Sequence, residues 1–209
     1  MDSDLTLKAP LNSRFRGFFP VVIDVETGGL EARTDALLEL AAVTLTLNDV
    51  GQLVLDQVFM EHIVPFEGSK LQPEALAFNK IDPFHPFRFA ISEQEALKKL
   101  FKLINQAKKA VKCQRAVLVG HNAWFDLSFL NAAIARTQVK QNPFHAFTCF
   151  DTATLSGIFY GQTVLSRAMH QSGIEFDSKE AHSAKYDAVQ TAKLFCNIVN
   201  LWYEKKDVR

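Results

Sequence analysis

The chain has 209 residues, of which 48% are hydrophobic and 22% charged, the composition of a soluble globular protein of about one domain. No apolar run approaches the roughly 20 residues that cross a bilayer, and the N-terminal segment lacks the apolar core of a signal peptide. We therefore expect a cytoplasmic protein without a membrane partner. Cys113, Cys149 and Cys196 are far apart and form no C-x-x-C pattern, which argues against a disulfide framework or a zinc cluster.

The formal net charge is zero, from 23 basic and 23 acidic residues. A balanced charge at first argues against a nucleic-acid partner. Acids gathered around metal ions, however, would not contribute their charge to the field that a polyanion experiences. Composition therefore leaves nucleic-acid binding open.

In chain order, a flexible arm at residues 1–12 is expected to precede a single domain at residues 13–209. Strands are predicted, from apolar runs bounded by turns, at residues 21–29, 37–47, 53–64 and 116–120 and within 140–151. Helices are predicted at residues 73–78, 92–112, 123–136, 152–157, 163–171 and 183–203. The order of these elements indicates an α/β fold.

Local signals predict how several elements begin and connect. The turn at residues 48–51 should pair the second and third strands as an antiparallel hairpin. Ser92 and Glu95 have the spacing of a capping box, and Asn122 is placed to cap the helix that follows it. Residues 65–91 are expected to form a long irregular connection with one short helix, and such ordered loops usually serve a function.

The first strand ends in two acids, Asp24 and Glu26, within the sequence VVIDVETGG. Side chains two residues apart on a strand share a face, so both carboxylates should project the same way. Their repulsion must be offset by a raised pKa or by a cation that prefers oxygen ligands, such as Mg²⁺ or Mn²⁺. A strand end that is merely solvated is the alternative, and these residues alone do not decide between them.

Three polar residues further along the chain are candidates for the same site. Asp126 has the helical register of Phe129 and Leu130, where an unpaired buried carboxylate is costly, although it could also favour the helix N-terminus. Asp187 belongs to the first turns of the last helix. His182 is five residues earlier, so it cannot share the helical face of Asp187 and is expected in the preceding loop.

The positions of these residues in an α/β sheet allow them to converge at the strand ends. Four carboxylates together require cations, and two divalent ions suit in-line displacement at phosphorus. A neutral histidine near pH 7 could take the proton of the attacking water. The hypothesis is therefore a metal-dependent phosphodiester hydrolase.

The segment before the first strand, Arg14 to Phe19, mixes basic and aromatic side chains. This combination suits phosphate binding and base stacking. A hydrophobic lead-in with two solvated arginines explains the segment equally well.

Three motifs in order resemble those of the DEDD 3′→5′ exonucleases of the branch with a catalytic histidine, namely D-V-E-T at 24–27, H-N-x-x-F-D at 121–126 and H-x-x-x-x-D at 182–187. Segments such as RFRGFFPVVIDVETGG, LQPEALAFNKIDP and FDSKEAHSAKYD, between about residues 13 and 203, resemble the ribonuclease T family. The resemblance implies a ribonuclease-H-like mixed five-stranded sheet flanked by helices. It also implies a homodimer that trims the 3′ ends of tRNA, ribosomal RNA precursors and other stable RNAs, and that digests single-stranded DNA.

The resemblance also implies the role of each site residue. Two Mg²⁺ ions, or Mn²⁺, would be held by Asp24, Glu26, Asp126 and Asp187, and His182 would be the general base. The residues implied in nucleic-acid binding are Glu74, which contacts the last nucleotide, the stacking residues Phe78, Phe125 and Phe147, and the basic residues Arg14, Arg16, Lys109, Arg115 and Lys140. The basic residues would serve the active site of the partner subunit.

Two residues depart from the family pattern. Leu30, which the resemblance also implies in nucleic-acid binding, stands where the family usually has a stacking phenylalanine, and Trp124 stands where a smaller polar residue is common. These departures concern the preference for the end nucleotide and not the chemistry. A proofreading exonuclease subunit or an oligoribonuclease would share the metal site but not the Arg14 to Arg16 segment, and a binding module without catalysis would lack one of the acids or the histidine.

Overall fold

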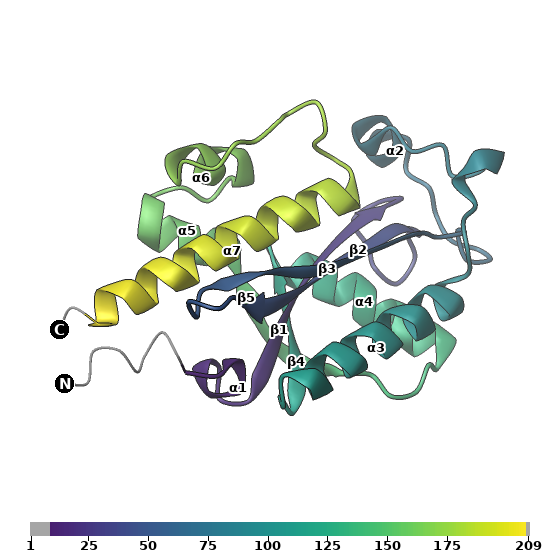
Figure 1. The fold of residues 1–209 in the computed structure, drawn as a ribbon. Coiled ribbons are helices and arrows are strands. Elements are labelled where there is room, and N and C mark those ends of the chain that lie inside the picture. Colours follow the sequence, from purple (N-terminus) through teal and green to yellow (C-terminus); the bar gives the residue numbers. More distant parts are fainter. Residues whose placement is uncertain (1–8, 208–209) are drawn as a thin grey trace.

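The computed structural model describes residues 9–207, with the side chains of residues 206 and 207 outside that description. Its strands are β1 (Phe18–Thr27), β2 (Leu37–Leu47), β3 (Leu53–His62), β4 (Arg115–Gly120) and β5 (Phe144–Asp151). They form one sheet in the order β3-β2-β1-β4-β5 (Figure 1). β1, β2 and β3 pair antiparallel, whereas β4 pairs parallel with both β1 and β5. The predicted mixed five-stranded α/β sheet is confirmed.

The helices are α1 (Leu11–Arg14), α2 (Pro73–Asn79), the 3-10 turn η1 (Pro86–Arg88), α3 (Glu93–Ala110), α4 (Trp124–Thr137), α5 (Thr152–Tyr160), α6 (Leu165–Gln171) and α7 (Ala184–Asp207). α7 lies along β1, β2 and β3 on one face of the sheet, and α3 and α4 pack together against the other (Figure 1). α5 and α6 pack against α7. Within the described residues, no helix is both long and apolar enough to span a membrane.

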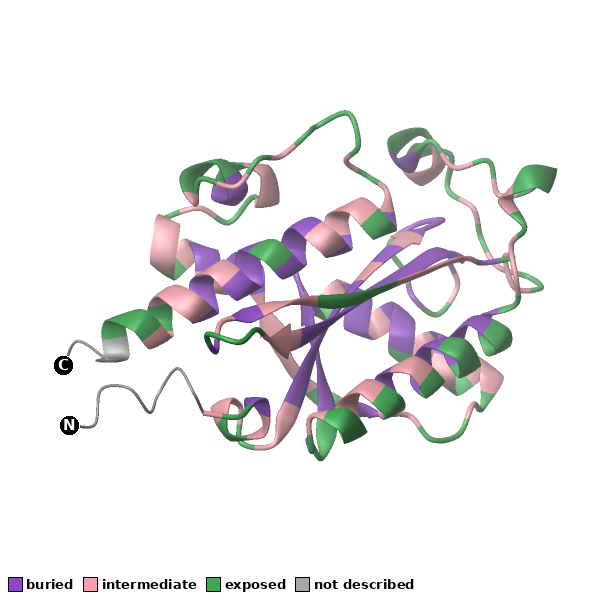
Figure 2. Ribbon diagram, viewed as in Figure 1, coloured by how far each residue is buried: buried purple, intermediate pink, exposed green. Residues whose placement is uncertain are grey.

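The core lies between these layers, and β1 and β4 are at its centre (Figure 2). Val21, Val22 and Ile23 of β1 are fully buried, as is every residue from 116 to 119 of β4. Both strands are apolar on both faces because helices cover both sides of the sheet. The carboxylates at the end of β1 are therefore held on a rigid, close-packed base.

Most predicted local signals are confirmed, and one is wrong. Ser92 Oγ accepts the backbone N–H of Glu95 at the start of α3. Asn122 does not cap α4, because its φ is +62° and Ala123 is the N-cap residue. Asparagine tolerates this left-handed conformation, which turns the chain sharply after β4. The carboxylate of Asp151 instead accepts the backbone N–H groups of Asn122 and Ala123.

The N-terminal region differs in part from expectation. Residues 1–8, most of the predicted flexible arm, lie outside the described residues. Leu11 begins α1 and is buried in the core, so the described part of the arm is packed against the domain. The assignment of residues 13–209 to a single domain stays a prediction.

Candidate active site

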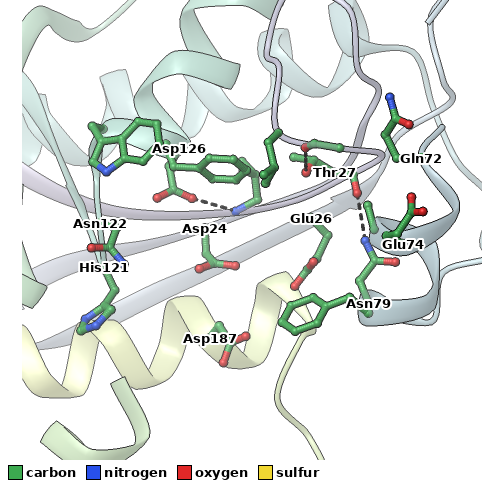
Figure 3. Close-up of a pocket in the computed structure, with 17 residues that line it drawn as sticks. Asp24, Glu26, Thr27, Gln72, Glu74, Asn79, His121, Asn122, Asp126 and Asp187 are labelled. Carbon is green, nitrogen blue, oxygen red and sulfur yellow. Dashed lines mark hydrogen bonds between the residues drawn. The ribbon is translucent and has the colours of Figure 1, made fainter. Parts of the chain in front are cut away.

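Three carboxylates meet where β1 ends and α7 begins. Asp24, Glu26 and Asp187 each place an oxygen within 4.8 Å of the other two. Figure 3 shows the three side chains pointing toward one another from the strand and the helix. The alternation of side chains along β1 brings Asp24 and Glu26 to the same face, and the first turn of α7 supplies Asp187. A solvated strand end does not describe this arrangement.

The N-terminus of α7 is held in place by polar contacts. Glu39, which lies opposite Glu26 on β2, accepts the backbone N–H of Ala184 at 3.2 Å. Asp187 Oδ2 accepts the backbone N–H of His182 at 2.9 Å. These contacts position Asp187 because they fix the turn from which the helix starts.

Asp126 lies on α4, and its side chain is directed at β1. The residue is only 4% exposed, and its Oδ1 accepts the backbone N–H of Val25 at 3.1 Å (Figure 3). It lines the same cavity as Asp24 and Glu26, but it is not among the three acids whose oxygens lie within 4.8 Å of one another. Asp126 therefore lies beside the cluster of the other three carboxylates.

The environment of these acids favours their neutral forms. Burial, together with the charges of Asp126 and Asp187, raises the pKa of Asp24 well above its usual range. Burial and the charge of Asp187 raise the pKa of Glu26 to about 8. Burial also raises the pKa of Asp126 and of Asp187. An all-oxygen donor set with unfavourable negative charge is a site that a hard divalent cation would stabilise.

His182 lies in the loop before α7, as expected. Its φ is +70°, and the residue is exposed. Its imidazole packs on the ring of Phe78, with the two ring centroids 4.0 Å apart. A cavity of about 480 Å³ is lined by His182, Asp24 and Asp187 together. His182 is thus placed beside the carboxylates and is open to solvent.

A larger cavity of about 980 Å³ lies over the carboxylates and has mostly apolar walls. Of the residues predicted to bind nucleic acid, Glu74 and Phe78 from α2, Phe125 from α4 and Leu30 from the loop after β1 line it. Phe147 on β5 is exposed and packs edge-on against His145, and it is not among the lining residues. The structure therefore places every predicted stacking residue but Phe147 at this cavity.

The predicted basic residues lie away from the carboxylates. Arg115 pairs with Phe18 at the start of β1, six residues before Asp24, which corresponds to roughly 20 Å along the strand. Lys109 and Lys140 line a separate cavity of about 360 Å³ at the end of α3. None of the five basic residues is among those that line the large cavity.

The guanidinium of Arg14 makes hydrogen bonds and a ring contact within the protein. It donates to the backbone carbonyls of Ala9 and Gly51 and lies over the ring of Tyr203, 4.7 Å from the centroid. Arg16 is exposed. Arg14 thus connects α1 to the β2–β3 turn and to α7, a role that the sequence did not predict.

A family model described as an exonuclease (RNase_T) matches residues 21–195. A protein named ribonuclease T from Shewanella denitrificans is 58% identical over 92% of this chain and 85% of its own length. Another of the same name from Vibrio campbellii is 60% identical over 92% and 90%. The chain belongs to the ribonuclease T family. It is a metal-dependent 3′-exonuclease.

Solved structures support the fold of this ribonuclease T family member. A full-length 3′-exonuclease superposes with a TM-score of 0.70 at 20% identity, over 89% of this chain and 62% of that chain. Escherichia coli exonuclease I in complex with a dT13 oligonucleotide superposes with a TM-score of 0.67 at 16% identity, over 90% and 42%. The chain spans less than two thirds of the length of each of these two proteins. The similarity of the structures confirms the expected ribonuclease-H-like fold.

The exonuclease site includes residues to which the sequence analysis gave no role. His121 lines both cavities, but both of its ring nitrogens are engaged, Nδ1 with Thr152 Oγ1 at 3.0 Å and Nε2 with the carbonyl of Thr163 at 2.8 Å. Burial lowers its pKa. Buried Asn79 donates to the backbone carbonyl of Thr27 and so fixes α2 to the end of β1. The second motif contains His121 in its H-N dipeptide, so the sequence could have indicated this residue. No sequence feature indicated Asn79.

Proposed function

We propose that this protein removes nucleotides one at a time from the 3′ ends of tRNA, ribosomal RNA precursors and other stable RNAs, and from single-stranded DNA, in the cytoplasm. The observation that carries the proposal is the cluster of Asp24, Glu26 and Asp187, with oxygens within 4.8 Å of one another, at the base of an aromatic cavity. The carboxylates supply the chemistry, and the aromatic walls suit unpaired bases.

The four acids fit two Mg²⁺ ions, with Mn²⁺ as the alternative, because all donors are carboxylate oxygens with raised pKa values. Asp24 would contribute to both ions, Glu26 and Asp187 to one, and Asp126 to the other. When bound, such a pair of ions activates water and stabilises the leaving oxygen in phosphodiester hydrolysis.

His182 is proposed to take the proton from the attacking water. It borders the cavity that Asp24 and Asp187 line, and it is exposed. His121 is less suited to this role because Thr163 and Thr152 engage its ring nitrogens. An imidazole is effective here because its ordinary pKa lies close to neutral pH.

The end of the RNA is proposed to enter the large cavity, with its last nucleotide against Glu74 and its bases stacked on Phe78 and Phe125. Phe147, which is exposed on β5, would stack on a base outside the cavity. An opening with apolar walls at the carboxylates favours unpaired ends, because base pairs would have to be broken to reach it.

The basic residues are proposed to act in a homodimer. Arg115 pairs with Phe18 at the start of β1, roughly 20 Å along the strand from Asp24, and Lys109 and Lys140 line a cavity at the end of α3. Basic side chains at this distance are too far away to bind the phosphates next to the carboxylates of their own subunit. Placed on the partner subunit, Arg16, Lys109, Arg115 and Lys140 could hold the phosphates that lead into the site, with Arg14 supporting them.

Timed digestion of 5′-labelled RNA and DNA oligonucleotides that differ only in their last two bases tests the activity. With Mg²⁺ we expect products that shorten by single nucleotides from the 3′ end, and with chelator we expect none. Internal cleavage, or turnover in chelator, would contradict the proposal.

Mixed dimers test the shared site. Asp24→Asn leaves the basic residues intact, and a variant with Arg16→Ala and Lys140→Ala leaves the carboxylates intact. If the basic residues serve the partner's site, mixing the two impaired proteins restores part of the activity. If the basic residues instead serve the active site of their own subunit, the mixture will be no more active than the two separate proteins, and the proposal is wrong.

A further inference from the structure

A tryptophan side chain lies at the rim of the carboxylate cavity. Trp124, the first residue of α4, is 68% exposed, although an indole has one of the largest apolar surfaces among side chains. It lines the cavity of about 980 Å³ together with Asp24 and Asp126. It also lines a second cavity of about 730 Å³. An exposed indole at this position requires an explanation that packing does not supply.

The indole is held by the residues beneath it. Trp124 and Phe125 pack edge to face, with ring centroids 5.9 Å apart and planes at 88°. Phe125 in turn packs against Phe129, which is fully buried, with the two ring centroids 5.0 Å apart. An edge-to-face pair engages at most one face of the indole, and among the described residues Phe125 is its only ring contact. Since 68% of Trp124 is exposed, much of its indole is available to a ligand.

Leu30 continues the same rim. It is 84% exposed and, among residues 9–207, is the only one besides Trp124 that lines both cavities. The loop that carries it is held by Asp35, whose carboxylate accepts the N–H of Glu31 at 3.0 Å and the hydroxyl of Thr34 at 2.9 Å. A Cβ atom on Gly29 would lie 2.0 Å from that carboxylate, so this position has no room for a side chain. Leu30 and Trp124 thus form an apolar ridge that borders both cavities.

We propose that Trp124 is a substrate-binding residue of this exonuclease, and that a base of the 3′-terminal dinucleotide stacks on its indole while Leu30 contacts the edge of that base or its sugar. The inference rests on the proposed function and adds a specificity determinant to it. An indole has few rotatable bonds, so stacking on it costs little side-chain freedom. Purines overlap more of an indole than pyrimidines do, so the contact favours ends in A or G.

The chain contains two tryptophans, Trp124 and Trp202, which makes a direct optical test possible. Trp202 lies near the end of α7, is 54% exposed and packs against Phe159, and it lines neither cavity. Trp202→Phe leaves Trp124 as the sole indole, and Trp124→Phe leaves Trp202. Both variants are made in the His182→Ala background with Mg²⁺, so that short oligoadenylate and oligouridylate probes bind with little hydrolysis.

We expect oligoadenylate to quench the emission of Trp124 and to leave that of Trp202 unchanged. In parallel anisotropy titrations with end-labelled probes, Trp124→Ala should weaken binding by about five- to 100-fold, which corresponds to the energy of one stacked base. Trp124→Phe should lose less, oligouridylate should be affected less than oligoadenylate, and Trp202→Ala should not differ from the parent.

Failure of this inference can be distinguished from failure of the proposed function. If the probes bind but Trp124 emission does not change, the stacking role is overturned, even if Trp124→Ala cannot be purified. Equal affinities of the parent and Trp124→Ala would overturn it as well. If no variant, the parent included, binds either probe, the proposed function itself is wrong.

Discussion

The imidazole of His182 packs against the ring of Phe78, with centroids 4.0 Å apart and planes at 50°. One residue comes from the loop before α7 and the other from α2, so the contact joins two segments that border the carboxylates. The contact places the proposed general base, His182, next to Phe78, which is proposed to stack on a nucleobase of the substrate.

Replacing His182 by Ala should slow cleavage by about 10²- to 10⁴-fold, the usual contribution of a general base. RNA affinity should stay nearly unchanged, because the carboxylates and most aromatic walls are intact. Single-turnover rates and anisotropy titrations at equal Mg²⁺ provide the two measurements. If affinity fell as far as the rate, His182 would be a substrate contact and not the base.

Asp24→Asn should abolish hydrolysis without loss of folding. The substitution removes a ligand but also removes a buried charge that Asp126 and Asp187 repel, so the metal-free protein should melt no lower than the parent. Turnover assays and thermal melts in chelator check both points. The matched control is Asp49→Asn in the exposed β2–β3 turn, which should keep full activity. Substantial turnover by Asp24→Asn would refute the metal-site assignment.

The metal-free protein should lose stability as the pH rises from about 4.5 to about 8. Glu26 has a folded pKa of about 8, against an ordinary value of 4.5, mainly because of burial. The folded state therefore binds more protons than the unfolded state between these values, and unfolding becomes easier as those protons are lost. Thermal melts in chelator at several pH values measure the trend.

Two comparisons test the cause of that trend. Mg²⁺ should raise the melting temperature more at pH 8 than at pH 5, because it replaces the lost protons at the carboxylates. Asp24→Asn should show a flatter pH dependence than the parent. A melting temperature that rises steadily with pH in chelator would contradict the raised pKa values.

Arg16 and Lys140 should determine part of the salt dependence of RNA binding. Each phosphate contact that is lost should lower the slope of log affinity against log salt by about 0.7 for a single strand. Titrations of Arg16→Ala, Lys140→Ala and the double variant at several salt concentrations measure it. Lys193→Ala, an exposed lysine on α7, is the control and should leave the slope unchanged. Identical slopes for all four variants would show that Arg16 and Lys140 do not bind phosphates of the RNA.

Arg14→Ala should destabilise the protein by about 1–3 kcal/mol, whatever it does to RNA binding. The reason is that Arg14 donates to Ala9 and Gly51 and lies over Tyr203. Arg16→Ala removes only one exposed contact, with the ring of Phe18, and should change the free energy of unfolding by about 1 kcal/mol at most. Urea unfolding of both variants gives the comparison, and equal stabilities would show that the Arg14 contacts contribute little.

The local elements were predictable because side-chain direction follows the chain with fixed periods. The apolar runs of β2 and β4 and the period of α3 placed these elements within a residue or two of their observed ends. The same logic put Asp24 and Glu26 on one face and His182 in a loop. The three motifs then indicated the exonuclease family, since few other sites need these acids in this order.

The distances between elements were decided by the tertiary structure alone, since they depend on strand register and on how helices pack across the sheet. Sequence spacing did not show that Asp187 joins Asp24 and Glu26 within 4.8 Å while Asp126 binds the amide of Val25. Nor did it show that Arg14 is engaged within the protein, because its partners come from distant segments. Leu30 and Trp124 likewise line the same two cavities although they are far apart in the sequence, and no local pattern encodes that proximity.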